Sequence, residues 1–309
     1  MRGTFGLEDF RPGQEAVIDS IVDGHDTIAV MPTGAGKSLC YQLPALHLPG
    51  ITVVVSPLIA LMKDQTDKLQ ALGVRARQVN SAIDAAELKD ALSAIDKGEV
   101  EFVFATPERL EDPDFIALFK QHHVDLFVVD EAHCLSEWGH DFRPAFLGLG
   151  TAIKEVGSPP VLALTATATV RVLQDIVRGL GLKDPATFNL GIYRSNLQYE
   201  VRHTANDTAK QQHLIRILRE MDGSGIVYCA TVKNCEAVTR VLEAEGISGG
   251  MYHGRMAASR RRETQDRFRT GDLHAIVATN AFGMGIDKPD IRFVVHYDMP
   301  GSLESYYQE

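Results

Sequence analysis

Residues Thr27 to Ser38 read Thr-Ile-Ala-Val-Met-Pro-Thr-Gly-Ala-Gly-Lys-Ser, an apolar run followed by two glycines, a lysine and a serine. The run Thr27–Met31 predicts a buried strand and Lys37–Leu46 predicts a helix, which is the strand-loop-helix setting of a phosphate-binding loop. Glycines let backbone N–H groups turn toward phosphate oxygens, and the helix adds the positive end of its dipole. A glycine-rich turn before a buried helix is the alternative, because the strict pattern has glycine where Met31 stands.

As a phosphate-binding loop, this segment assigns a role to each polar residue. Lys37 is expected to reach the β- and γ-phosphates of ATP, and Ser38 to ligate Mg²⁺. Thr33, Gly34 and Gly36 form the rest of the expected nucleotide cradle.

Two acidic residues follow a second apolar run. Leu126–Asp130 predicts a strand, and Glu131 and His133 come directly after it. In a parallel sheet, ligands gather where strands end, so Asp130 is expected to hold Mg²⁺ through water and Glu131 to deprotonate the attacking water. His133 completes the set of catalytic candidates. The alternative is a helix N-terminus stabilised by acidic residues, but the phosphate-binding loop upstream favours nucleotide hydrolysis.

Short β-branched runs alternate with helical patterns along the chain, which predicts parallel sheets covered by helices on both faces. The pattern restarts after residue 190, with strands expected at Gly225–Cys229, Ala275–Thr279 and Arg292–His296. We therefore predict an α/β protein with two lobes, residues 1–190 and 191–309. The remaining strands expected in the first lobe are Ile51–Ser56, Phe102–Ala105 and Val161–Thr165, and Ile59–Leu72 is expected to be a helix.

The composition is that of an ordinary globular protein, with 309 residues, 45% hydrophobic and 23% charged. The net charge of −10 lies entirely in residues 1–190, whereas residues 191–309 hold equal numbers of acidic and basic residues. An arginine-rich stretch from Arg255 to Arg269 suits a nucleic-acid partner or, alternatively, a solvated helix face. No stretch predicts a membrane span or a signal peptide, and none of the four cysteines forms a C-x-x-C pair, so a cytoplasmic protein without zinc is expected.

The residues after Glu131 carry a resemblance to a known family. Asp130-Glu-Ala-His133 is a DEAH-type box of superfamily 2 helicases, and Cys134-Leu-Ser-Glu-Trp-Gly-His-Asp-Phe-Arg-Pro144 resembles the aromatic-rich loop of RecQ-family DNA helicases. The resemblance implies two RecA-like lobes. It also implies that Trp138, Phe142 and Arg143 contact single-stranded DNA beside the ATP site, although the two aromatic residues alone would also suit a core.

Other segments resemble motifs of the same family in the same order. Phe10-Arg-Pro-Gly-Gln14 implies that Arg11 and Gln14 recognise the adenine nucleotide. Ala163-Leu-Thr-Ala-Thr-Ala168 implies that Thr165 and Thr167 link hydrolysis to movement. Ala278-Thr-Asn-Ala-Phe-Gly-Met-Gly-Ile-Asp-Lys-Pro289 implies DNA contact by Thr279 and ribose contact by Asp287.

The resemblance also implies features that this sequence lacks. A glycine- and arginine-rich motif that supplies an arginine finger, and the zinc-binding, winged-helix and HRDC regions of many relatives, would follow Glu309. An arginine finger contributes roughly 10³–10⁵ in turnover in related systems. We therefore expect a truncated second lobe, and a chain that binds ATP and Mg²⁺ but hydrolyses ATP poorly.

The resemblance implies an ATP-dependent 3′→5′ DNA helicase core acting on single-stranded and duplex DNA in repair and recombination. Three alternatives stay open from the residues alone. They are an RNA helicase of the same superfamily, a non-catalytic ATP-gated DNA-binding fragment, and a P-loop ATPase that is not a helicase.

Overall fold

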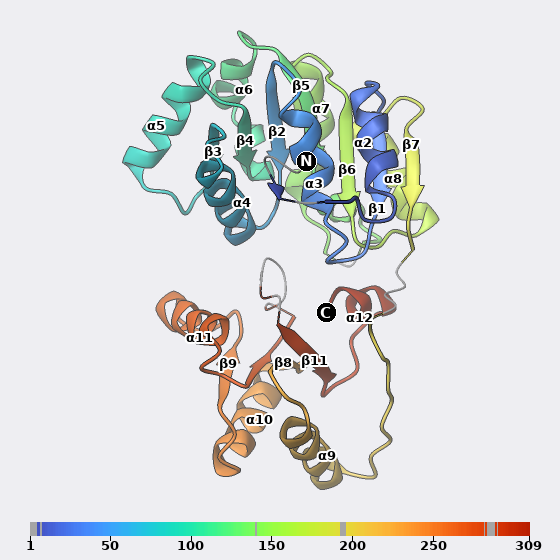
Figure 1. Cartoon of the computed structure of the whole chain (residues 1–309), viewed down its shortest axis with the longest axis vertical. Coiled ribbons are helices and arrows are strands. Elements are labelled where there is room, and N and C mark those ends of the chain that lie inside the picture. The colour runs from blue at the N-terminus through green and yellow to red at the C-terminus, as the bar shows by residue number, and fades with distance from the viewer. Residues whose placement is uncertain are drawn as a thin grey trace. The chain divides into compact units, whose positions relative to one another are not determined.

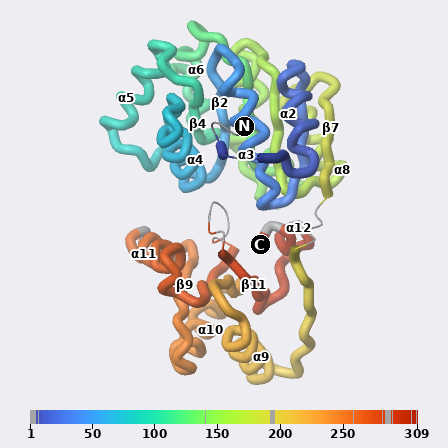
Figure 2. Tube along the Cα trace, viewed as in Figure 1, coloured from blue at the N-terminus to red at the C-terminus, as the bar shows by residue number. Residues whose placement is uncertain are grey.

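The computed structural model of the chain describes residues 5–6, 8–139, 141–191, 196–280, 282, 288 and 290–309. It divides the chain into two compact units, Met1–Arg194 and Ser195–Glu309. Figure 1 labels the elements of both units, and Figure 2 follows the same trace from its blue N-terminus to its red C-terminus.

The first unit is built on a seven-stranded sheet in the order β3-β4-β2-β5-β6-β1-β7, with all neighbouring strands parallel. Four of the five inner strands, β4, β2, β6 and β1, are buried at every position, so they form continuous apolar runs, as parallel sheets covered on both faces require. The strands are β1 (Thr27–Val30), β2 (Ile51–Val55), β3 (Ala76–Val79), β4 (Phe102–Ala105), β5 (Val124–Val129), β6 (Val161–Thr165) and β7 (Ala186–Asn189).

Helices cover both faces of this sheet (Figure 1), and each face has its own hydrophobic core. One core receives side chains from α5 (Ala85–Asp96), α6 (Pro113–Phe119), α7 (Leu149–Glu155) and α8 (Val170–Leu180). The other receives them from α2 (Gln14–Val22), α3 (Lys37–Ala45) and α4 (Ile59–Ala71). Three short 3₁₀ helices, η1 (Pro107–Glu111), η2 (Ala132–Leu135) and η3 (Pro144–Gly148), complete the unit.

The second unit has a four-stranded parallel sheet in the order β11-β8-β10-β9. Its strands are β8 (Ser224–Tyr228), β9 (Gly249–Tyr252), β10 (Ala275–Ala278) and β11 (Ile291–His296), and its helices are α9 (Asp207–Glu220), α10 (Val232–Ala244), α11 (Ala258–Thr270) and α12 (Leu303–Gln308). Side chains of α9 and α10 pack on one face of the sheet, and Phe268 of α11 packs on the other. The prediction of two α/β lobes with parallel sheets is confirmed.

Most predicted strands lie within one or two residues of their expected positions. The expected strands Thr27–Met31 and Ala275–Thr279 each end one residue earlier, at Val30 and Ala278. Three further strands, β3, β7 and β9, were not predicted.

All four cysteines are free and buried, and burial raises the pKa of the Cys40 thiol to about 12. Among the described residues, no helix has the length and apolar character needed to cross a membrane.

Candidate nucleotide and nucleic-acid site

The phosphate-binding loop turns on two glycines at the carboxyl end of β1. Gly34 has φ 81° and Gly36 has φ 83°, a left-handed backbone that glycine adopts without strain. Gly36 caps the N-terminus of α3, and Lys37 and Ser38 are the first two residues of that helix. Thr33 and Gly34 are exposed, so the loop presents its backbone to solvent at a helix N-terminus, where N–H groups are unpaired.

Two predicted nucleotide-binding residues brace this loop. Gln14, which is buried, donates from Nε2 to the carbonyl oxygens of Ala35 and Gly36 at 3.2 and 3.0 Å. Arg11 donates from its guanidinium to the carbonyl oxygen of Gly34. Since the Gln14 amide nitrogen bonds to the loop, the structure gives this residue a loop-supporting contact that the sequence did not indicate.

The acidic pair lies at the end of β5, next to β2 in the sheet. The backbone N–H of Asp130 donates to the carbonyl oxygen of Val55 at 2.8 Å, and its carboxylate accepts a hydrogen bond from the Ser56 side chain. Burial raises the pKa of Asp130, while the positive charge of Lys37 opposes this shift. The sequence did not predict this contact between Ser56 and Asp130, although Ser56 directly follows β2, the strand beside β5.

Glu131 has an unusual backbone and an unusual carboxyl. Its φ of 51° is left-handed, which is rare outside glycine, and it precedes a four-residue 3₁₀ helix that its side chain does not cap. Burial and the neighbouring Asp130 raise the pKa of Glu131 to about 7, and Lys37 opposes this shift. Its Oε2 is buried and has no hydrogen-bond partner among the described residues. The acidic pair therefore does not act as a helix cap.

His133 connects the acidic pair to β6. Its Nδ1 lies 2.9 Å from Thr165 Oγ1 and 3.4 Å from Glu131 Oε2. The Thr165 hydroxyl donates its one proton to the carbonyl oxygen of Thr167 at 2.9 Å, so it accepts from His133. The bonding pattern thus places a proton on His133 Nδ1. It also brings together Glu131, His133, Thr165 and Thr167, all of which were predicted site residues.

The segment after η2 holds three of the four predicted DNA-contacting residues. The Trp138 side chain is 61% exposed, so it is not a core residue, and Phe142 is half-buried. Arg143 pairs with Asp141, at 2.8 Å from its Nη2 to Oδ2, and Nη1 donates to the carbonyl oxygen of Pro57 at 3.3 Å. The segment therefore offers an exposed indole seven residues after Glu131.

In the second unit, Thr279 follows β10, and its backbone N–H donates to the carbonyl oxygen of Tyr252 at 3.3 Å. Asp287, predicted to contact the ribose, lies outside the described residues.

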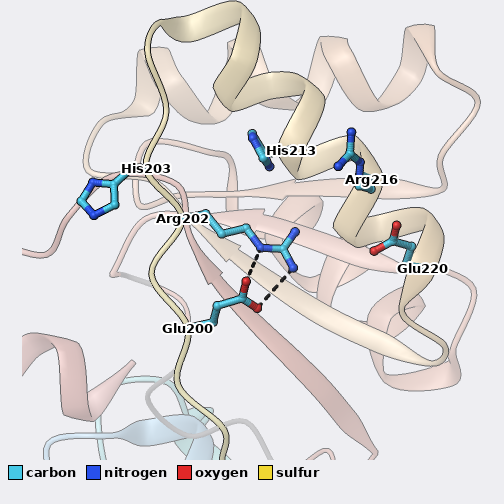
Figure 3. Close-up of a pocket in the computed structure, with 6 residues that line it drawn as sticks. All are labelled: Glu200, Arg202, His203, His213, Arg216 and Glu220. Carbon is cyan, nitrogen blue, oxygen red and sulfur yellow. Dashed lines mark hydrogen bonds and ion pairs between the residues drawn. The ribbon is translucent and has the colours of Figure 1, made fainter.

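A separate pocket of about 430 Å³ lies in the second unit. Figure 3 shows Arg202 and Glu200, on the segment before α9, joined by two hydrogen bonds of 2.8 and 3.2 Å. His213, Arg216 and Glu220 reach the pocket from α9. No predicted site residue lines this pocket.

Two family models match the chain. A DEAD/DEAH box helicase model matches residues 11–176, and a helicase conserved C-terminal domain model matches residues 209–309. The solved structures that this chain resembles include Saccharomyces cerevisiae Dbp5 bound to RNA and ADP BeF₃ (19% identity, TM-score 0.73, 99% of this chain and 81% of that one). They also include Mycobacterium smegmatis helicase Lhr bound to single-stranded DNA and AMP-PNP (20% identity, TM-score 0.74, 99% of this chain and 44% of that one). At these identities the likeness shows the fold alone.

Curated relatives are more similar in sequence. The chain is 42% identical to the probable ATP-dependent DNA helicase RecS of Bacillus subtilis over 99% of this chain and 62% of that protein. It is 40% identical to the ATP-dependent DNA helicase RecQ of Haemophilus influenzae over 100% of this chain and 50% of that protein. The chain thus spans between half and two thirds of the length of these relatives.

Proposed function

This chain belongs to the DEAD/DEAH box helicase family, in its RecQ branch, and on that basis we propose that it is the motor core of an ATP-dependent 3′→5′ DNA helicase. Its task in this proposal is to couple ATP hydrolysis to movement along single-stranded DNA and to unwinding of duplex DNA during repair and recombination. The observation that carries the proposal is that the loop with Lys37 follows β1 and the Asp130–Glu131 pair follows β5, at the carboxyl ends of parallel strands of one sheet, where the charge of Lys37 lowers the pKa of both carboxyls.

The residues present fit ATP with Mg²⁺. The two left-handed glycines expose the loop backbone. Among the described residues, Lys37 Nζ makes one hydrogen bond, a long one of 3.4 Å to the Met31 carbonyl oxygen, so its other N–H donors can bind phosphate. Ser38 and Asp130 would hold Mg²⁺. The described residues contain no group of three or more His, Cys, Asp or Glu able to hold a metal. This suits Mg²⁺, which takes one or two protein carboxylates and otherwise uses water and substrate phosphates.

Glu131 is the proposed general base. A carboxyl with a pKa of about 7 is well matched to proton abstraction near neutral pH, and its Oε2, which makes no hydrogen bond to a described residue, can accept one from the attacking water. His133 holds Glu131 in place and connects it to Thr165. Mg²⁺, when bound, would neutralise charge on the phosphates.

Arg11, Gln14, Thr33, Gly34 and Gly36 complete the proposed nucleotide site. Asp287 of the second unit remains a proposed ribose contact.

The proposed DNA site is the segment with Trp138, Phe142 and Arg143, together with Thr279 of the second unit. An exposed indole can stack on any base, and arginine can bind phosphate, which suits single-stranded DNA of varied sequence. Thr165 and Thr167 would link ATP hydrolysis to movement. Thr165 is hydrogen-bonded to His133 of the nucleotide site and to the carbonyl oxygen of Thr167. The names of both curated relatives support DNA rather than RNA as the strand.

Steady-state ATPase of this chain with oligothymidine, oligouridine or neither tests the proposal. We expect a low turnover that DNA stimulates and RNA stimulates little. Lys37→Ala should lower turnover by roughly 10²–10³, since it removes a charge that binds the transferring phosphate. The matched control is Lys89→Ala, an exposed lysine of α5, which should leave turnover unchanged.

Two results would redirect the proposal. Stronger stimulation by RNA would favour an RNA helicase of the same superfamily. Nucleotide-dependent DNA binding without multiple turnovers, even in a version extended through the glycine- and arginine-rich motif that the family resemblance implies, would favour the ATP-gated DNA-binding protein.

A further inference from the structure

One face of the exposed Trp138 indole is covered by a cation. The guanidinium carbon of Arg171 lies 3.6 Å from the centre of the Trp138 ring, which is stacking distance. Arg171 is an exposed residue in the first turn of α8, about thirty residues further along the chain. A base that stacks on this face must therefore displace Arg171.

The backbone beside Trp138 is anchored to the same helix. Ser136, which is buried, donates from Oγ to Asp175 Oδ2 at 2.6 Å and accepts from the backbone N–H of Trp138 at 3.2 Å. Asp175 lies four residues after Arg171, on the same side of α8, and also binds Arg178 at 2.6 Å. The loop backbone is thus held in place, while the contact between Trp138 and Arg171 lies at the surface and can open.

Arg171 is available to a phosphate. It makes no hydrogen bond or ion pair with any of the described residues, whereas the carboxylate of Asp175 is already shared by Ser136 and Arg178. A guanidinium stacked on a ring keeps its N–H donors, which lie in its own plane, free for a phosphate oxygen.

We propose that Arg171 is a positioning residue of the single-strand site, an inference that rests on the function proposed above. Arg171 covers the Trp138 face in the absence of DNA, yields it to a base, and then binds the phosphate of the same strand. The relative strengths favour this exchange. A cation–π contact on an exposed indole favours the covered over the uncovered state by roughly 2–5-fold. A base stacked on the same indole favours the bound over the unbound state by roughly 5–150-fold.

The first test uses the fact that Trp138 is the chain's single tryptophan. Its fluorescence emission without DNA is compared among the wild type, Arg171→Ala and a control, Arg75→Ala, which removes an exposed arginine of the first unit. We expect Arg171→Ala to change the emission and Arg75→Ala to leave it unchanged. Identical emission from wild type and Arg171→Ala would overturn the covering contact.

The second test measures oligothymidine binding without nucleotide over a range of salt concentrations. One phosphate contact on a single strand contributes a slope of about −0.7 to the plot of log K against log salt. Arg171→Ala should therefore reduce the steepness by about 0.7, Arg171→Lys should restore it, and Arg75→Ala should not change it. An unchanged slope in Arg171→Ala would overturn the phosphate contact.

Binding of oligothymidine by the wild type distinguishes failure of the proposed DNA-binding function from failure of the proposed role of Arg171. If it does not bind oligothymidine, the DNA-binding function proposed above fails together with the role of Arg171. If it binds and Arg171→Ala matches it in both emission and salt slope, the role of Arg171 alone fails. Thermal unfolding of each variant verifies that the first unit is intact.

Discussion

At the scale of single residues, Glu131 combines a rare backbone with a buried carboxyl. A non-glycine residue in the left-handed region costs on the order of 1 kcal/mol or more, and burial of the carboxyl adds a desolvation cost. Both costs fall on the residue proposed as the general base. The ligand-free protein is therefore less stable than its packing allows at this position.

The cost of burying the Glu131 carboxyl should depend on pH, and the Glu131→Gln variant should reveal this dependence. The folded-state pKa of about 7 is above the ordinary value of 4.5, so the folded protein holds the proton more tightly than the unfolded chain. Stability is therefore lost as pH rises from about 4.5 to 7. At pH 8 we expect Glu131→Gln to be more stable than the wild type by on the order of 1–3 kcal/mol.

Urea unfolding of both proteins at pH 8 and pH 5, without nucleotide, measures this difference. It should shrink strongly at pH 5, where the wild-type carboxyl is protonated in the fold. An equal difference at both pH values would show that the charge of Glu131 is not its source.

Sequence patterns predicted where residues of a contiguous motif lie relative to the strands and helices. The structure places Asp130 and Glu131 directly after β5, and Lys37 and Ser38 at the start of α3, the helix after β1. The contact between Ser56 and Asp130 depends on β2 pairing with β5, and strand order is not written in local sequence. The position of Arg171 over Trp138 likewise depends on how α8 packs beside η2.

At the scale of elements, α8 packs closely against α7 and η2 because a glycine lies at each contact. A Cβ built on Gly150 of α7 would fall less than 3.0 Å from the carbonyl oxygen of Gly179 in α8. A Cβ on Gly179 would meet the Leu135 side chain of η2, at 2.5 Å from Cδ2. These contacts set the position of the helix that carries Arg171 and Asp175.

Gly150→Ala should therefore destabilise the first unit by roughly 1–3 kcal/mol, because backbone cannot move aside as a flexible side chain can. The matched control is Gly148→Ala, two residues earlier, where a Cβ would have Glu111 Cγ at 3.8 Å as its nearest neighbour. Thermal unfolding compares the two variants. Equal melting temperatures would mean that α7 and α8 can separate without cost.

The three strands that the sequence did not reveal have physical explanations. β3 contains Arg77 and Gln78, and the edge strand β7 has no fully buried position, so neither forms an apolar run. β9 begins with Gly249 and Gly250, which locally favour a turn. A Cβ on either glycine would approach Leu242 or Leu273 to 2.7 or 2.5 Å, so tertiary packing requires glycine within this strand.

At the scale of the whole molecule, charge is unevenly distributed. The first 190 residues carry the entire net charge of −10, so the proposed binding of a DNA strand would depend on local basic groups. Arg260 and Arg267 of α11 are exposed, lie seven residues apart on one side of the helix, and have no ion pair with any described residue. They form a candidate contact for the DNA backbone.

The double variant Arg260→Gln/Arg267→Gln should weaken oligothymidine binding and reduce the steepness of its salt dependence by up to about 1.4, the equivalent of two phosphate contacts. The control variant Lys89→Gln/Lys97→Gln removes the same charge from exposed positions of the first unit. Binding titrations at several salt concentrations distinguish them. Equal effects of the two variants would attribute the loss to total charge alone.

The burial of all four cysteines has a practical consequence. Thiol reagents attack exposed thiolates, and the side chains of Cys40, Cys134, Cys229 and Cys235 are at most 3% accessible. A cysteine introduced at one exposed site in each unit would then accept a maleimide dye while the native four stay unlabelled. Energy transfer between two such dyes would measure whether the distance between the two labelled sites changes when ATP or oligothymidine is added, with no need for a cysteine-free background.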